Sequence, residues 1–161
     1  MSHLAVLTSG GDAPGMNASL RAIVRSATNN SINVYGVSNG FEGLIDDRFS
    51  ELKPRQVGNI IQRGGSILQT SRSKRFLDKN YRDKARANLS KRNIGSVIVI
   101  GGEGSLKGAR CLGEDGNINV LGLPATIDRD IPSVGPTIGF DTAINTALQA
   151  IDRIRDTAST R

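Results

Sequence analysis

Hydrophobic positions along this chain follow two patterns that alternate. Short apolar runs, which are typical of buried strands, occupy residues 4–8, 32–37, 96–100 and 118–123. The third run is the strongest, and its continuous Val-Ile-Val-Ile is expected of a central parallel strand, because both faces of such a strand are covered. Between the runs, apolar residues recur every three or four positions, which predicts amphipathic helices.

Four helices are predicted from this spacing. Their inward-facing residues are Met16, Leu20, Ile23, Val24 and Ala27; Tyr81, Ala85 and Leu89 in a charged helix over 79–92; Leu106, Ala109 and Leu112; and Ile144, Ala147, Leu148, Ile151 and Ile154 in a helix that starts at a capping Asp141. A fifth helix is expected from Pro54 through Gln62, and residues 40–50 are expected to form a loop with one helical turn. Strands that alternate with helices predict an α/β fold, a three-layer sandwich around a mostly parallel sheet.

Composition narrows the class of protein. The 161 residues fit one domain at ~100–200 residues per domain. No apolar stretch approaches the ~20 residues of a membrane span, and the first residues show no signal-peptide pattern. The single cysteine, Cys111, suits a reducing compartment, so a cytoplasmic location is expected, and its helical context indicates a packing role. The net charge of +6 allows a nucleic-acid partner, but aromatic residues are only 4% and no nucleic-acid motif is present, so none is expected.

Polar loops follow three of the predicted strands. The first is Ser9-Gly-Gly-Asp-Ala-Pro-Gly15, the second is Gly101-Gly-Glu-Gly-Ser105, and the third is Thr126-Ile-Asp-Arg-Asp130. In open α/β sheets, ligands bind beyond the carboxyl ends of the strands, so we expect the three loops to line one edge of the sheet.

The residue types in these loops suit phosphate chemistry. Glycine turns before a helix present free backbone N–H groups to a polyphosphate. Glu103 can take part in holding Mg²⁺, and Asp128 can accept a proton from a hydroxyl group. Arg72 can stabilise developing negative charge. Together these are the working parts of phosphoryl transfer.

Each feature also has a plainer interpretation. Glycine-rich strand-to-helix turns are often only structural, and Glu103 is favoured at a helix start by the helix dipole. Asp128 and Asp130 can simply shape a polar turn, and Arg72 can be a solvated loop residue. The sequence pattern alone leaves these alternatives open.

Several motifs of this chain resemble the bacterial type of the 6-phosphofructokinase family in their order and spacing. They are Leu7-Thr-Ser-Gly-Gly-Asp-Ala-Pro-Gly-Met-Asn17, Arg63-Gly-Gly65 with Arg72, Gly101-Gly-Glu-Gly-Ser105, Thr126-Ile-Asp128, and Thr137-Ile-Gly-Phe-Asp-Thr-Ala143. The resemblance covers the entire chain but only about the first half of a family subunit.

The resemblance implies a kinase that transfers the γ-phosphoryl group of ATP, with Mg²⁺, to the 1-hydroxyl of fructose 6-phosphate, giving fructose 1,6-bisphosphate. It implies roles for the following residues: ATP contacts from Gly11, Arg72, Ser73, Gly102, Glu103, Gly104 and Ser105; Mg²⁺ at Glu103; Asp128 as the base; the reacting end of the sugar at Thr126, Ile127 and Asp128; and an allosteric nucleotide between subunits at Arg21, Arg25 and Arg155. The family forms homotetramers, so a homo-oligomer is implied as well.

Two positions point to ATP rather than pyrophosphate as the phosphoryl donor. Pyrophosphate-using relatives resemble Gly-Gly-Asp-Asp in the second loop and carry a lysine before Thr-Ile-Asp, where this chain has Gly104 and Ala125. A side chain at 104 would crowd the adenosine side of ATP.

This chain also departs from the family pattern. Glu103 replaces the commoner aspartate. Arg129 replaces an asparagine, and its charge could pair with Asp130 or disturb it. Pro54 stands where effector-binding relatives often carry an arginine. The groups that hold the sugar phosphate in the family lie beyond the part matched by this chain.

Two main interpretations follow. In the first, residues 1–136 form the nucleotide-binding domain of a phosphofructokinase, and 137–161 form a helix that leads toward a sugar-phosphate-binding domain. In the second, the chain is a non-catalytic nucleotide-binding or regulatory module. A basic nucleic-acid binder is a third alternative, for which steep salt dependence of DNA binding would be the test.

Overall fold

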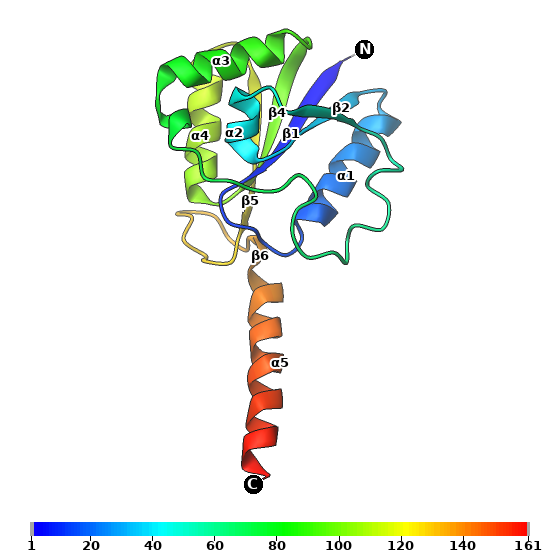
Figure 1. Ribbon diagram of the computed structural model, residues 1–161, viewed down its shortest axis with the longest axis vertical. Coiled ribbons are helices and arrows are strands. Elements are labelled where there is room, and N and C mark those ends of the chain that lie inside the picture. The colour runs from blue at the N-terminus through cyan, green and yellow to red at the C-terminus, as the bar shows by residue number, and fades with distance from the viewer. Residues whose placement is uncertain (1, 161) are drawn as a thin grey trace.

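The computed structural model describes residues 2–160 and contains a central sheet with helices on both sides (Figure 1). Over these residues the sheet has six strands in the order β3-β2-β1-β4-β5-β6. Their bounds are β1 His3–Ser9, β2 Asn33–Val37, β3 Phe49–Leu52, β4 Ile94–Gly101, β5 Asn119–Thr126 and β6 Ile138–Gly139. The helices are α1 Met16–Asn29, α2 Gly40–Ile45, α3 Lys79–Ser90, α4 Glu103–Glu114 and α5 Phe140–Ser159, with a 3₁₀ turn, η1, at Arg75–Leu77.

The sheet is parallel except at one edge, where β3 pairs with β2 in the antiparallel sense. The predicted strand at 96–100 is the middle of β4, which pairs with β1 on one side and β5 on the other. Val99 and Ile100 are fully buried on opposite faces, as the continuous apolar run predicts.

Two apolar cores lie on the two faces of the sheet. One contains the α1 residues Met16, Leu20, Val24 and Ala27, packed against Val6, Val34 and Ile100. The other contains residues of α2, α3 and α4, among them Leu44, Leu89 and Leu112, packed against Leu7 and Val99. The predicted three-layer α/β sandwich is therefore confirmed.

Three local predictions were wrong. Residues 54–62 form successive turns rather than a helix, and Val57 and Ile60 reach the core from those turns. The helical turn expected within 40–50 is present as α2, but the loop expected after it contains the start of β3, which was not predicted. Tyr81 faces outward with 37% of its surface exposed, whereas Ala85 and Leu89 of the same helix are fully buried as predicted.

The C-terminal elements differ most from expectation. The strand predicted at 118–123 belongs to β5, but it is not buried, since Leu121 is 56% exposed. The last predicted helix is present as α5, which begins after Gly139 at a left-handed backbone angle (φ +104°) and not at a capping Asp141. A Cβ atom at Gly139 would lie 2.9 Å from the carbonyl oxygen of Pro14, so only glycine fits this entry to the helix.

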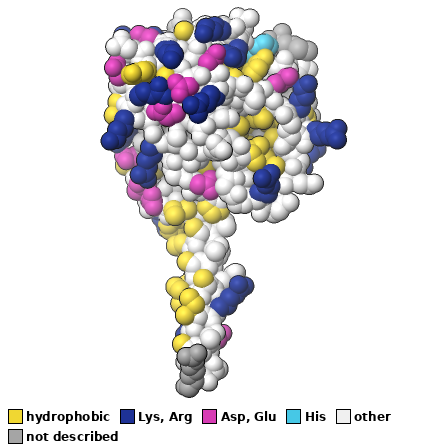
Figure 2. Space-filling model, viewed as in Figure 1, with side chains coloured by type: hydrophobic (Ala, Val, Ile, Leu, Met, Phe, Trp, Pro, Cys, Tyr) yellow, Lys and Arg dark blue, Asp and Glu magenta, His cyan; other side chains and the backbone are white. Residues whose placement is uncertain are grey.

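Helix α5 projects away from the rest of the chain (Figure 1), and no residue in it is buried. Its apolar residues, Ile144, Leu148, Ile151 and Ile154, form an exposed face, which Figure 2 shows as hydrophobic atoms along the stalk. None of the helices in residues 2–160 has the length and apolar character to cross a membrane.

Candidate functional site

The three glycine-rich and acidic loops lie together at the carboxyl edge of the sheet. Strand pairing places Ser9 opposite Gly101 and Gly101 opposite Pro124, so β1 and β4 end together and β5 continues two residues further, to Thr126. The loops also touch beyond the strands, because an atom added at the Cβ position of Gly102 would lie 3.5 Å from Cβ of Thr126. The convergence predicted from the sequence is therefore present.

Two glycines make this close approach of the first and second loops possible. A Cβ atom at Gly101 would lie 2.5 Å from the carbonyl oxygen of Ser9, a distance that side chains do not tolerate. Gly10 adopts a left-handed angle (φ +87°), and a Cβ there would lie 3.1 Å from the hydroxyl of Ser105. A side chain at Gly101 would push the loops apart, whereas one at Gly10 would be strained by the left-handed backbone angle.

The segment from 63 to 72 folds back over the first loop and brings Arg72 to the site. The backbone N–H of Gly10 donates to the carbonyl of Ser71 at 3.1 Å. The Asp12 carboxylate accepts from the N–H of Ser66 at 3.1 Å. The Asn17 side chain accepts from Ile67 N–H and donates to the carbonyls of Arg63 and Gly65. Asp12 and Asn17 therefore shape this part of the chain, and Asp12 faces the cavity as well.

The loops enclose a cavity of about 700 Å³. It is lined by all the predicted ATP-binding and sugar-binding residues: Gly11, Arg72, Ser73, Gly102, Glu103, Gly104, Ser105, Thr126, Ile127 and Asp128. Asp130 also lines it, as do Gly10 and Lys107. Positions separated by more than one hundred residues in the sequence thus share one space, which is large enough for a nucleotide-sized ligand.

Charged groups are concentrated at one end of the cavity. Glu103, at the start of α4, pairs with Lys107 at 2.8 Å, one helical turn along. Asp128 is exposed, and its backbone N–H donates to the Thr126 hydroxyl at 3.1 Å. Thr126 is buried, and its carbonyl accepts from the Thr137 hydroxyl at 2.9 Å, so the stem of this loop is fixed while the carboxylate of Asp128 stays available.

Arg72 and Arg129 behave differently at this end. Within residues 2–160, Arg72 is exposed and forms no salt bridge, so its charge is available to a ligand. Arg129 has a left-handed backbone angle (φ +52°), and its guanidinium lies 5.3 Å from the ring centre of Phe140. The pairing of Arg129 with Asp130 that the sequence suggested is not formed.

The other end of the cavity was not predicted and is mostly apolar, with Arg82, whose guanidinium donates to the carbonyls of Phe76 and Leu77, also in its lining. Phe41 of α2 and Phe76 of η1 stack with ring centres 4.1 Å apart and planes 24° apart. Gly108 of α4 packs against both rings. Leu77, which is 82% exposed, and Cys111 complete this end. Cys111 is half-buried and forms part of the cavity wall.

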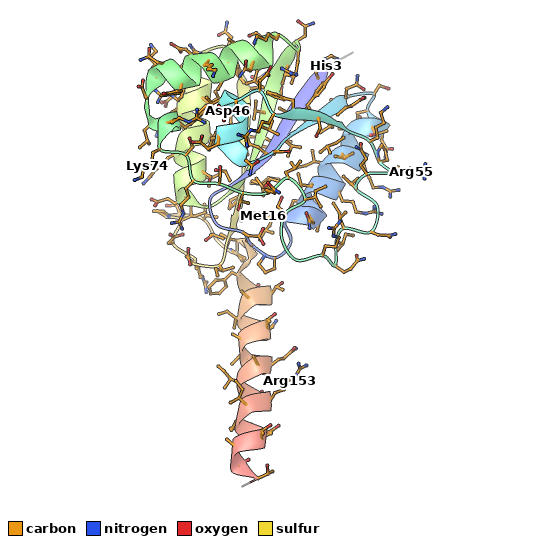
Figure 3. All side chains as sticks on the ribbon, viewed as in Figure 1. His3, Met16, Asp46, Arg55, Lys74 and Arg153 are labelled. Atoms are coloured by element: carbon orange, nitrogen blue, oxygen red, sulfur yellow. The ribbon has the colours of Figure 1, made fainter. Side chains whose placement is uncertain are left out.

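An ion-pair cluster lies directly behind this apolar wall. Arg75, next to Phe76 in sequence, donates to Glu42 from Nε at 2.8 Å and to Asp46 from Nη1 at 3.1 Å. The hydrogen bonds from Arg75 lower the pKa values of both carboxyl groups, against the opposing effect of partial burial on Glu42. The same bonds raise the pKa of Arg75. Figure 3 shows Asp46 between the helices on this side of the sheet.

The three arginines predicted for an allosteric nucleotide do not meet within one copy of the chain. Arg21 of α1 donates to the carbonyl of Val57 at 3.0 Å, and Arg25 is exposed on the same helix. Arg155 lies on the projecting part of α5 and pairs with Asp152 at 3.4 Å. A site that uses all three needs contributions from more than one chain.

Nothing among residues 2–160 forms a metal site from three or more acidic, histidine or cysteine side chains. Magnesium in nucleotide sites is commonly held by one or two carboxylates together with substrate phosphates and water. The donor set at this cavity, with Glu103 beside the glycine loops, fits that type of site.

The phosphofructokinase family matches residues 3–161. The chain belongs to the phosphofructokinase family. It is 52% identical over 160 residues to the ATP-dependent 6-phosphofructokinase of Staphylococcus carnosus, covering 99% of this chain and 50% of that protein. It is 55% identical over 158 residues to the enzyme of the same description from Coxiella burnetii, covering 98% and 48%. The chain thus spans about half the length of the curated relatives it matches.

Solved phosphofructokinase structures share the fold. The structure of phosphofructokinase from Saccharomyces cerevisiae superposes with a TM-score of 0.92 at 30% identity, covering 99% of this chain and 25% of that one. A pyrophosphate-dependent phosphofructokinase from Nitrosospira multiformis gives a TM-score of 0.83 at 21% identity, covering 99% and 42%. At that identity the second likeness concerns the fold only.

Proposed function

We propose that this chain supplies the nucleotide-binding half of an ATP-dependent 6-phosphofructokinase. The reaction transfers the γ-phosphoryl group of ATP to the 1-hydroxyl of fructose 6-phosphate and yields fructose 1,6-bisphosphate, a step of glycolysis. The observation that carries the proposal is a single cavity that contains the glycine loops, Arg72 and Asp128, in a chain about half identical to enzymes of that description. ATP and fructose 6-phosphate are the substrates in this proposal.

The proposed roles follow from what each group offers. The backbone N–H groups at 102–105, at the start of α4, bind phosphate oxygens with the help of the helix dipole. Gly11 keeps the first loop free of side chain, and Arg72 and Ser73 add polar contacts to the phosphates. Arg72 also stabilises the charge that develops on the transferred group. Asp128 accepts the proton of the sugar hydroxyl, with Thr126 and Ile127 beside it.

Glu103 is the proposed contact for Mg²⁺. When bound, this ion neutralises charge on the phosphates. Because Glu103 pairs with Lys107 across one turn of α4, ligand binding has to draw the carboxylate away from that lysine. The pair is exposed, and exposed pairs are worth little, so the exchange costs little.

ATP is the donor that the cavity shape favours. A Cβ atom at Gly104 meets nothing within 4 Å, so the space over this residue is open on the cavity side. The apolar end, with Phe41, Phe76 and Leu77, offers contact area to a base and ribose that pyrophosphate does not have. Both features support a nucleotide.

The exposed apolar face of α5 is the proposed contact with a sugar-phosphate-binding half. Ile144, Leu148, Ile151 and Ile154 are all exposed here, and β5 adds Leu121. Exposed apolar surface of this extent marks an interaction site. We further propose a homotetramer in the cytoplasm, in which Arg21, Arg25 and Arg155 of different copies bind an allosteric nucleotide.

Titration calorimetry of the 161-residue chain with Mg-ATP tests the nucleotide assignment, and a coupled assay for fructose 1,6-bisphosphate tests transfer. Saturable ATP binding with turnover supports the kinase. ATP binding without turnover favours the alternative for this chain taken alone, a non-catalytic nucleotide-binding or regulatory module. Absence of ATP binding contradicts both. Where turnover is present, Asp128→Asn is expected to abolish it and to leave ATP affinity unchanged; near-normal turnover would exclude Asp128 as the base.

A further inference from the structure

The short turn η1 carries Phe76 and Leu77 to the cavity; Phe76 is buried in the apolar core, Leu77 is 82% exposed, and the turn is also held by two arginines. On one side, Arg75 binds the two α2-side carboxylates, Glu42 and Asp46, through four hydrogen bonds. On the other side, the Arg82 guanidinium donates to the carbonyls of Phe76 at 3.1 Å and Leu77 at 2.7 Å, and it also pairs with Asp115. These charged groups therefore fix the backbone of the turn together with the buried ring of Phe76.

The contacts of Arg75 act directly on the stacked rings. Arg75 and Phe76 are adjacent in η1, as are Phe41 and Glu42 in α2. The ion pairs of Arg75 and the Phe41–Phe76 ring stack thus join the same two elements, η1 and α2. The ion pairs lie outside the cavity, and the ring stack lines it. The Ser73 hydroxyl accepts from the N–H of Phe76 at 3.1 Å and ties the turn to the residues beside Arg72.

We infer that Arg75, held by Glu42 and Asp46, is a positioning residue for nucleotide binding, which keeps Phe76 against Phe41 and thereby preforms the apolar end of the cavity. The inference rests on the proposed function, in which the phosphates occupy the glycine-loop end and the base and ribose occupy the apolar end. Arg75 itself does not line the cavity. Without the ion pairs, the turn has to become ordered when the ligand binds. The free-energy cost of that ordering weakens the observed affinity.

The inference predicts a selective loss. Arg75→Gln is expected to raise the Kd of ATP about tenfold, since ordering one or two side chains on binding costs about that much. Inorganic tripolyphosphate contacts only the glycine-loop end, so its Kd is expected to stay within about twofold. Arg75→Lys, which keeps the charge but loses the forked geometry, is expected to fall between the parent and Arg75→Gln.

The matched control is Arg92→Gln. Arg92 binds the neighbouring carboxylate Asp47 and lies 4.4 Å from the ring centre of Phe49, much as Arg75 lies 5.4 Å from that of Tyr81. It is outside the cavity wall, so both affinities should stay at the parent value. Glu42→Gln keeps the bonds of Arg75 to Asp46 and serves as a second, milder variant if Arg75→Gln does not fold.

The inference is tested by calorimetric titration of each variant with ATP and with tripolyphosphate. Thermal unfolding of the same variants shows whether they are folded. Weaker ATP binding with unchanged tripolyphosphate binding in the Arg75 and Glu42 variants, and no change in Arg92→Gln, supports the inference. Unchanged ATP affinity in a folded Arg75→Gln or Glu42→Gln overturns it, as does equal weakening of both ligands. If the parent chain does not bind ATP, the proposed function fails first and the inference falls with it.

Discussion

Single residues in the second loop show two different uses of glycine. At Gly101 a Cβ atom would lie 2.5 Å from the Ser9 carbonyl, so the residue is required for the strands to end side by side. At Gly104 a Cβ atom would meet nothing within 4 Å, so no packing inside the chain requires glycine there. Gly104 also lines the cavity, so a side chain at this position can be tested for its effect on a ligand.

Because of this difference, Gly104→Asp is expected to weaken ATP binding without destabilising the fold. The ATP Kd is expected to rise at least about tenfold, because a carboxylate is placed in the nucleotide space near the phosphates. Thermal stability should change little or rise by about 0.5 kcal/mol, since an acidic residue in the first turn of α4 is favoured by the helix dipole. Calorimetry with ATP and thermal unfolding measure the two effects.

The control for this prediction is Gly104→Ala, whose methyl group carries no charge and should weaken ATP binding less. Pyrophosphate affinity measured on the same variants shows whether the loss is confined to the nucleotide. An unchanged ATP affinity in Gly104→Asp would show that the nucleotide does not occupy the space beside residue 104.

How far the site could be predicted depended on how its residues are spaced in the sequence. The glycine loops and Asp128 follow apolar strands directly, so strand ends alone placed them at one edge of the sheet. Phe41 and Phe76 stack across segments 35 residues apart in the sequence, and no local pattern reports such a contact. Cys111 fits a helical stripe whether or not a cavity lies beside it.

At the scale of elements, the strong patterns were predicted correctly and the weak ones were not. Strand β4 and helices α1 and α4 bury continuous or periodic apolar residues, which is the signal that sequence patterns carry. Strand β3 is an antiparallel edge strand of four residues with two of them exposed, so it lacks such a signal. In 54–62 the apolar spacing of Val57 and Ile60 is helical by coincidence, since both residues reach the core from turns.

The ion pairs that join α2, η1, α3 and α4 predict a dependence of stability on pH. The folded-state pKa values of Glu42 and Asp46 are lowered by Arg75, and that of Asp115 is lowered by Arg82. A carboxyl group whose pKa is lower in the folded than in the unfolded chain stabilises the fold above its ordinary pKa. That stability is lost as the pH falls through the folded value.

The melting temperature is therefore expected to be nearly constant from pH 7 to about pH 5 and to fall below the ordinary carboxyl values of 4.5 and 3.8. Thermal unfolding at a series of pH values measures this, and Arg75→Gln should show a shallower decline because two of the lowered pKa values depend on Arg75. A decline of equal steepness in parent and variant would assign the acid sensitivity to other groups.

At the scale of the whole molecule, packing is unevenly distributed. The sheet and helices α1 to α4 enclose two apolar cores, whereas α5 projects from β6 with all of its residues unburied (Figure 1). An isolated helix of 20 residues is marginally stable in water, because most helical stability in proteins comes from packing of the apolar face. We therefore expect a partner that covers the apolar stripe of α5 to stabilise the helix.

Hydrogen exchange on the 161-residue chain tests whether α5 is less protected than the packed core of the sheet. Amides of β4, such as those of Val99 and Ile100, are expected to exchange only by global unfolding, since both residues are fully buried in the middle of the sheet. Amides at 144–157 in α5 are expected to exchange orders of magnitude faster at high dilution, through local opening of the unpacked helix.

The protection of these α5 amides should rise with protein concentration if copies of the chain cover the apolar face. Ile151→Glu should remove that rise without changing the protection of β4. Protection of α5 equal to that of β4 at high dilution would show that the helix is stable without a partner and would remove the reason for proposing one.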